Sequence, residues 1–277
     1  LSGNNYETEN VLGEDTGTAI TGAFSPYGTS IEPGQVIAGK IPCSGSILRV
    51  PVEGGPVEMV AWGFRNPFGL AVSPDGYLFI TDNGYDDRGS RPVWGGGDFL
   101  WQIQTGTWYG WPDFSGGKSV TTEEFQPPGN DPVEPVLEHY PNEPPQPSAI
   151  LGVHSSSNGF DFSANQAFGY EGEAFIAQFG DMAPNVGKIM SPVGFKVVRV
   201  DPATGIVTDF AVNRGDVNGP ASWQESGGLE RPVAARFNPS GEALYIVDFG
   251  IMEVTENGPQ PHEETGTVWK ITKHSEE

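Results

Sequence analysis

One hairpin pattern occurs twice in this sequence, and it restricts the folds that the chain can adopt. The stretch 62–84, WGFRNPFGLAVSPDGYLFITDNG, contains the β-favouring runs GLAV and YLFI on either side of Ser-Pro-Asp-Gly, which supplies the angles of a tight turn. The stretch 231–250, RPVAARFNPSGEALYIVDFG, repeats this arrangement, with an arginine before the first strand and Asp-x-Gly after the second. A chain that repeats one hairpin is typical of a repeat architecture.

Further strand-like runs extend the pattern through most of the chain. SILRVPVEGGPVEMVAW reads as a hairpin, FLWQIQ as a third strand after it, and EAFIAQFGD and KVVRVDPATGIVTDFAV as strands of another unit. Gly84, Gly180 and Gly250 close three copies of one apolar strand. The 39 glycines and 25 prolines leave no apolar stretch with helical spacing over three turns. We therefore predict an all-β fold, and a β-propeller rather than a β-sandwich, since a sandwich does not require the same turn in each unit.

The domain organisation follows from where this pattern is absent. Residues 1–45 are rich in glycine, threonine and serine and are predicted to be an irregular N-terminal excursion. Residues 115–149 are rich in proline and are predicted to be an insertion loop. The aromatic corner 108–112, WYGWP, is expected to cover the core. Residues 1–277 then form a single β-propeller domain or part of one.

Composition excludes several classes of partner. Thirty-six acidic and 14 basic residues give a formal charge of −22, which repels nucleic acid and anionic lipid. No segment approaches the roughly 20 apolar residues of a membrane span. The single cysteine, Cys43, is expected to be an inert packed residue. The chain begins without Met and without a signal-like segment, so we expect it to be a processed or partial polypeptide.

Three motifs together resemble a known family. RNPFGLAVSPDG, WYGWPDF and GYEGEAFIAQFGD are similar to segments of the glucose/sorbosone dehydrogenase family, and the resemblance covers roughly residues 46–272. It implies a six-bladed β-propeller that oxidises sugars with pyrroloquinoline quinone (PQQ) and Ca²⁺. About three to four blades would lie in this chain. It also implies a small-molecule sugar or polyol as substrate and a periplasmic or extracellular location, and leaves the electron acceptor open.

The resemblance also implies site residues. Arg65 and Asn66 of the RNP corner would contact PQQ, whose three carboxylates and o-quinone suit a planar guanidinium. The backbone carbonyls of Gly84 and Tyr85 would hold Ca²⁺, which prefers hard oxygen ligands. The alternatives are an Arg65 that pairs with a nearby acid at the surface and a DNGYDD segment that is an Asx-rich turn.

Later blades of the family carry further basic side chains against the cofactor. His154, Lys188 and Arg231 fall in the corresponding regions and are predicted to bind PQQ. No motif fixes His154 or Lys188 to a family position. A solvated histidine in a Ser-rich corner and a solvated Arg231 beside Glu230 are the alternatives.

One departure from the family bears on activity. The family's general base is a histidine on a blade before the RNP corner, whereas residues 1–138 contain no histidine. No catalytic residue is therefore identified in this chain. A missing N-terminal segment or a second chain could supply the base, or the protein could be a relative without the chemistry. The functional hypotheses are sugar or polyol oxidation, a non-catalytic binding or assembly module, and, third, ring-opening hydrolysis by a calcium-containing propeller.

Overall fold

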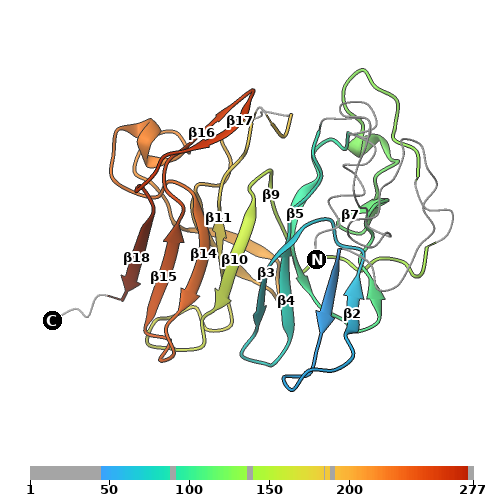
Figure 1. The fold of residues 1–277 in the computed structure, drawn as a ribbon, viewed down its shortest axis with the longest axis horizontal. Coiled ribbons are helices and arrows are strands. Elements are labelled where there is room, and N and C mark those ends of the chain that lie inside the picture. The colour runs from blue at the N-terminus through green and yellow to red at the C-terminus, as the bar shows by residue number, and fades with distance from the viewer. Residues whose placement is uncertain (1–44, 88–91, 136–139, 184, 188–190, 274–277) are drawn as a thin grey trace. The chain divides into compact units, whose positions relative to one another are not determined.

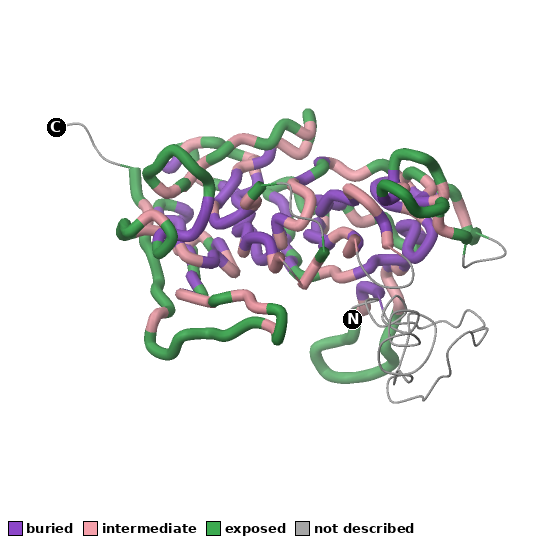
Figure 2. Tube along the Cα trace, turned by 90° about the horizontal axis from the view of Figure 1, so that it is seen from above, coloured by how far each residue is buried: buried purple, intermediate pink, exposed green. Residues whose placement is uncertain are grey.

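The computed structural model describes residues 45–87, 92–135, 140–183, 185–187 and 191–273. They form two compact units. One consists of the described residues within 45–67, 84–96 and 103–147, and is called unit 1; the other consists of the described residues within 68–83, 97–102 and 148–273, and is called unit 2. Figure 2 shows where the buried and the exposed stretches lie along the described chain.

Unit 2 contains a four-stranded sheet, β3-β4-β5-β9, and a seven-stranded sheet, β13-β12-β11-β10-β14-β15-β18 (Figure 1). The seven-stranded sheet divides, where β10 pairs in parallel with β14, into the antiparallel meander β10-β11-β12-β13 and the antiparallel set β14-β15-β18. The four-stranded sheet and these two parts have the strand order of three propeller blades. The bounds of these strands are β3 Pro67–Val72, β4 Leu78–Asp82, β5 Gly97–Gln102, β9 Ala149–Val153, β10 Ser157–Phe162, β11 Ala174–Gln178, β12 Lys196–Asp201, β13 Ile206–Ala211, β14 Pro232–Phe237, β15 Ala243–Asp248 and β18 Thr267–Thr272.

The first strands of neighbouring blades approach closely because glycines lie between them. β10 pairs in parallel with β14 at Gly159 and Ala234, and a Cβ on Gly159 would lie 2.9 Å from the Ala234 Cβ. On the other side of β10, the buried Thr81 hydroxyl accepts a hydrogen bond from the Gly69 N–H and donates one to the Asn158 carbonyl. First strands that lie side by side at the inner edge of successive sheets are the arrangement of a β-propeller.

Two apolar layers separate the three blades. Both consist of buried aliphatic and aromatic side chains that the strands point alternately toward the neighbouring sheet. The layer between the first and second blades contains Ala71, Phe79, Leu100, Ala149, Leu151, Phe160, Phe162, Ala174, Ile176, Val198 and Val200. The layer between the second and third contains Phe168, Phe175, Ala177, Val197, Leu229, Ala235, Leu244 and Ile246.

Unit 1 contains two small sheets and an aromatic core. Its strands are β1 Ser46–Arg49, β2 Glu58–Trp62, β6 Thr107–Trp108, β7 Phe114–Ser115 and β8 Lys118–Ser119, in the orders β1-β2-β6 and β7-β8. The core contains Tyr85, Val93, Trp111, Val120 and Phe125, with Met59, Trp62 and Val133 packed against it. Trp108, Tyr109 and Trp111 are all buried, so the expected role of the aromatic corner is confirmed.

The all-β fold and the partial propeller predicted from the sequence are confirmed. Among the described residues the helices are two short 3-10 turns, Glu123–Phe125 and Ala221–Gln224, and no helix is long and apolar enough to cross a membrane. The strands that the sequence did not predict include β9 and the hairpin β16 Met252–Thr255 with β17 Gly258–Pro261. Cys43 and nearly all of the N-terminal excursion lie outside the described residues.

Candidate functional site

The RNP corner in unit 1 buries Arg65, which carries an ion pair, while Asn66 and Pro67 are partly exposed. β2 ends at Trp62, and Gly63 follows with φ of +82°, where a Cβ would lie 2.2 Å from the Trp108 ring. This close approach requires glycine. Arg65 then lies 7% exposed, with its Nη2 3.3 Å from Asp86 Oδ1. Because Asp86 directly follows Tyr85, this ion pair joins the RNP corner to the predicted Ca²⁺ segment.

The Tyr85 side chain belongs to the core of unit 1. Its ring lies 4.8 Å from that of Trp111, and its hydroxyl donates a 2.6 Å hydrogen bond to the Pro112 carbonyl. Of Gly84 and Tyr85, only the backbone carbonyls could therefore bind a metal ion. Among the described residues, no three or more His, Cys, Asp or Glu side chains cluster as a metal site. Ca²⁺ binding at Gly84 and Tyr85 stays a prediction.

Arg231 occupies a buried position in unit 2, directly before β14. It is 2% exposed, and its guanidinium carbon lies 5.1 Å from the centre of the Phe179 ring and 4.9 Å from that of Phe195. Nη1 is the donor to three backbone carbonyls, at 3.1 Å from that of Asp181 and at 3.4 and 3.5 Å from those of Phe179 and Gly180. Nε and Nη2 have no hydrogen-bond partner among the described residues, so they are available to another acceptor.

Asp181 ends a short segment, 179–181, that contacts both Arg231 and the corner after His154. Arg231 Nη1 donates to the carbonyls of this segment, and its Phe179 and Gly180 N–H groups donate, each at 2.9 Å, to the carbonyls of Ser156 and Ser155. Burial raises the pKa of the Asp181 carboxyl, and this effect exceeds the opposing effects of the hydrogen bond from the Val193 N–H and of the charges on Arg231 and His154. Burial likewise lowers the pKa of Arg231, while Asp181 and Glu230 oppose that shift.

His154 lies in a strained corner before β10. His154 and Ser156 have φ of +57° and +51°, a conformation that residues other than glycine rarely adopt. Strain of this kind gathers at functional sites and persists only where neighbouring groups fix it. Here Ser155 and Ser157, both buried, bond to Asp98 and Gln178.

Asp181 and Asp98 were not predicted from the sequence. Asp181 ends the quoted motif GYEGEAFIAQFGD, and its place directly after a strand-closing glycine is a signal that could have identified it. Nothing local marks Asp98, because its hydrogen-bond partners lie 57 and 59 residues away in the sequence. The predicted residue Lys188 lies outside the described residues, so its placement is untested.

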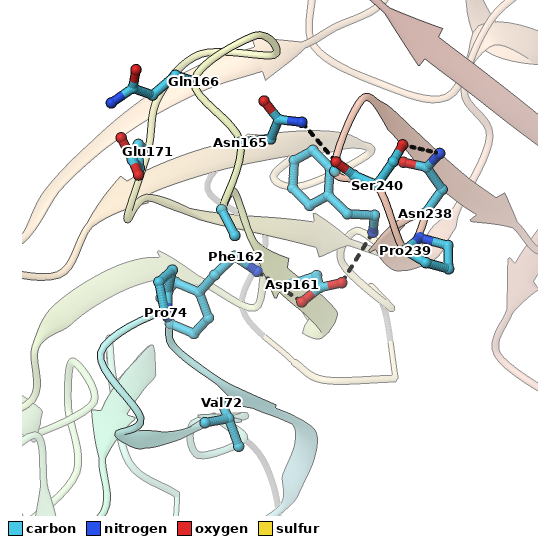
Figure 3. Close-up of a pocket in the computed structure, with 13 residues that line it drawn as sticks. Val72, Pro74, Asp161, Phe162, Asn165, Gln166, Glu171, Asn238, Pro239 and Ser240 are labelled. Atoms are coloured by element: carbon cyan, nitrogen blue, oxygen red, sulfur yellow. Dashed lines mark hydrogen bonds between the residues drawn. The ribbon is translucent and has the colours of Figure 1, made fainter.

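A hollow of about 690 Å³ lies elsewhere in unit 2, around the turn between β14 and β15 (Figure 3). Several of its polar groups hold turns of the backbone. Asp161 accepts the N–H groups of Phe162 and Phe237, Asn165 donates to the Ser240 carbonyl, and Asn238 donates to the Ser240 hydroxyl. Since these groups hold the backbone, the hollow is a weaker candidate site than the surroundings of Arg231.

Comparison with solved structures gives the fold. Two structures of glucose dehydrogenase match 84% of this chain at 21% identity, with TM-scores of 0.52 and 0.50, and the chain covers 56% and 55% of them. The chain has the fold of glucose dehydrogenase. A PQQ-bound aldose sugar dehydrogenase from Streptomyces coelicolor also matches, with 17% identity, a TM-score of 0.48, and coverage of 82% of this chain and 51% of that one.

The chain spans little more than half the length of these glucose-dehydrogenase-fold structures. No protein-family model matches it, and a search of curated proteins found no match. The solved structures confirm the fold that the motif resemblance implied.

The described residues fit the groups that the motif resemblance implies. Arg231 has unused guanidinium donors for a carboxylate such as those of PQQ, and it lies over two aromatic rings. Asn83, which directly precedes Gly84 and Tyr85, has a buried side-chain oxygen that accepts no hydrogen bond from a described residue. Such an amide oxygen is a ligand type that Ca²⁺ accepts.

Proposed function

We propose that the protein is a PQQ- and Ca²⁺-dependent dehydrogenase that oxidises a sugar or another polyol. The observation that carries this proposal is the Arg231 guanidinium, which is buried, lies over two aromatic rings and has donors to spare. Burying a cation is costly unless it meets an acceptor, so this position favours an anionic ligand. The shared fold and the RNP motif make PQQ the ligand class that fits best.

The residues have distinct roles in this proposal. Arg65, Asn66, His154, Lys188 and Arg231 bind and orient PQQ. The carbonyls of Gly84 and Tyr85, with the Asn83 side-chain oxygen, hold Ca²⁺. When bound, PQQ supplies the two-electron acceptor for the hydroxyl-bearing carbon of the substrate.

The general base is proposed to come from a further N-terminal segment or a second chain. The sugar itself, the electron acceptor and a periplasmic or extracellular location also remain part of the proposal.

Thermal unfolding with and without PQQ and Ca²⁺ tests the proposal. A ligand that binds only the folded state at 100 times its Kd stabilises by about 2.7 kcal/mol, so a clear rise in Tm is expected. Arg231→Lys keeps the charge but loses the planar fork, and should weaken PQQ binding by about tenfold or more.

Arg199→Lys is the matched control for Arg231→Lys. Arg199 also lies over an aromatic ring, 4.4 Å from the centre of Tyr170, but it is paired with Glu173. It should therefore leave PQQ binding unchanged. An unaltered Tm of the wild type with saturating PQQ and Ca²⁺, or equal PQQ affinities of the two variants, would contradict the proposed site.

A non-catalytic binding module is the second candidate, because the first histidine in the sequence is His139 and a base before the RNP corner is missing. Following dye reduction with a panel of aldoses and polyols separates the two. PQQ binding without dye reduction, in the presence of any N-terminal segment or second chain that the natural protein carries, would favour the module.

A further inference from the structure

The corner before β10 requires an explanation for its conformation. His154 and Ser156 both have positive φ, and the buried Ser155 lies between them. Residues other than glycine are strained in this region. Two such residues so close together persist only if the surrounding structure fixes the corner.

A buried hydrogen-bond network supplies this constraint. Asp98 Oδ2 accepts a 2.8 Å bond from the Ser155 hydroxyl and a 2.8 Å bond from the Ser157 N–H. Gln178 Nε2 lies 3.2 Å from each of the two serine hydroxyls, which are themselves 2.8 Å apart. All four side chains are at most 3% exposed, so these bonds operate away from water, where they are strongest.

The third blade shows what is unusual about this network. Gln178 ends β11 opposite Ser157, and Asp248 ends β15 opposite Pro232, so the two residues occupy equivalent positions. Asp248 itself accepts the N–H groups of Glu230 and Arg231, each at 2.8 Å. In the second blade this position is Gln178, whose side-chain amide donates to the hydroxyls of Ser155 and Ser157. The carboxylate that accepts the Ser157 N–H comes instead from Asp98 on β5, in the first blade.

This arrangement ties the position of His154 to a carboxylate from the neighbouring blade. The Ser155 and Ser156 carbonyls of the corner accept the Gly180 and Phe179 N–H groups, each at 2.9 Å. The carbonyls of residues 179–181 in turn accept Arg231 Nη1, so a shift of the corner would move the segment that holds Arg231 and Asp181. We infer that Asp98 is a positioning residue, which holds the corner 154–156 so that His154 is presented to the site formed with Asp181 and Arg231. The inference rests on the proposed function for the identity of the ligand, PQQ.

Asp98→Asn tests the inference with two readouts. The amide keeps the shape of the side chain but loses the charge, and one of its two polar atoms can no longer accept a hydrogen bond. The rate at which diethyl pyrocarbonate modifies His154, followed by peptide mass spectrometry, is expected to change at least about threefold. The exposed His262 serves as internal reference. PQQ affinity, measured by titration of tryptophan fluorescence, is expected to fall about tenfold.

Asp161→Asn is the matched control. Asp161 also accepts two backbone N–H bonds in unit 2, from Phe162 and Phe237, but it lies at the other end of β10. It should lower stability without altering the modification rate of His154 or the affinity for PQQ. If Asp98→Asn does not fold, Ser155→Ala removes one bond to Asp98 and is expected to change the same two readouts less.

The outcomes separate this inference from the proposed function. If the wild type fails to bind PQQ, the proposed function is wrong, while the His154 modification rate still reports whether Asp98 fixes the corner. If PQQ binds and a folded Asp98→Asn matches Asp161→Asn in both readouts, Asp98 is not a positioning residue.

Discussion

The Thr81 hydroxyl offers a direct test of how the first two blades are joined. It is fully buried, accepts the Gly69 N–H at 2.8 Å and donates to the Asn158 carbonyl at 2.7 Å, so one oxygen links strands β3, β4 and β10. Thr81→Val keeps the shape of the side chain but removes both bonds. Leaving a buried donor or acceptor without a partner costs about 1–3 kcal/mol, so the loss of two partners should cost about 2–6 kcal/mol.

The control is Thr81→Ser, which keeps the hydroxyl and loses one methyl group, at a cost of about 1 kcal/mol. Urea unfolding followed by tryptophan fluorescence would give both free energies. For a chain of this size 1 kcal/mol shifts Tm by about 2–4 °C, so Thr81→Val should lower Tm by about 4 °C or more. If Thr81→Val proves as stable as Thr81→Ser, the hydroxyl does not bridge the blades and the reasoning fails.

Three further predictions concern stability. Because burial raises the pKa of Asp181, the wild type should lose stability as pH rises through that pKa. The Tm of Asp181→Asn relative to that of the wild type should therefore rise between about pH 3 and about pH 7. A Tm difference that stays constant with pH would contradict this. Tyr85→Phe removes a buried hydrogen bond to a backbone carbonyl and should cost about 1–2 kcal/mol in urea unfolding, whereas an unchanged midpoint would show that the bond contributes nothing net. Gly180→Ala, at φ of +96° with a Cβ 2.4 Å from the Phe195 ring, should cost about 2 kcal/mol or more by the same assay, and clearly more than Gly172→Ala, whose Cβ meets nothing within 4 Å.

The sequence predicted strands where apolar runs are visible in the residues themselves. LFITD and AFIAQ form β4 and β11, in which all residues but Leu78 are buried, and ALYIVD forms β15, in which four of six residues are buried. Their β-branched and aromatic composition indicates a strand without knowledge of any neighbour. β9 was missed because it follows directly on a proline-rich segment. The hairpin β16–β17 was missed because none of its residues is buried, and its pairing leaves no apolar pattern in the sequence.

The candidate site residues came from the repeat and from the family resemblance. Arg231 was predicted because it stands before its strand as Arg65 stands before the earlier one, and its burial shows that the position is not a solvated surface. His154 came from a family resemblance without a fixed position. Asp98 and Asp181 depend on contacts with residues remote in the chain, which no local pattern records.

The ends of the second strands explain how a repeated scaffold can carry different chemistry in each blade. The interiors of these strands meet the same apolar surroundings, so their residues are similar from one blade to the next. The terminal residue instead faces the chain that leads into the first strand. With Asp248 at this position, the carboxylate accepts the backbone N–H of Arg231 and so fixes a cationic corner. With Gln178 at this position, the side-chain amide donates to the hydroxyls of Ser155 and Ser157. The backbone N–H of Ser157 then needs an acceptor from another strand, and Asp98 supplies it. One exchange between carboxylate and amide therefore changes which side chains a corner can hold, while the apolar layers that form the fold stay the same.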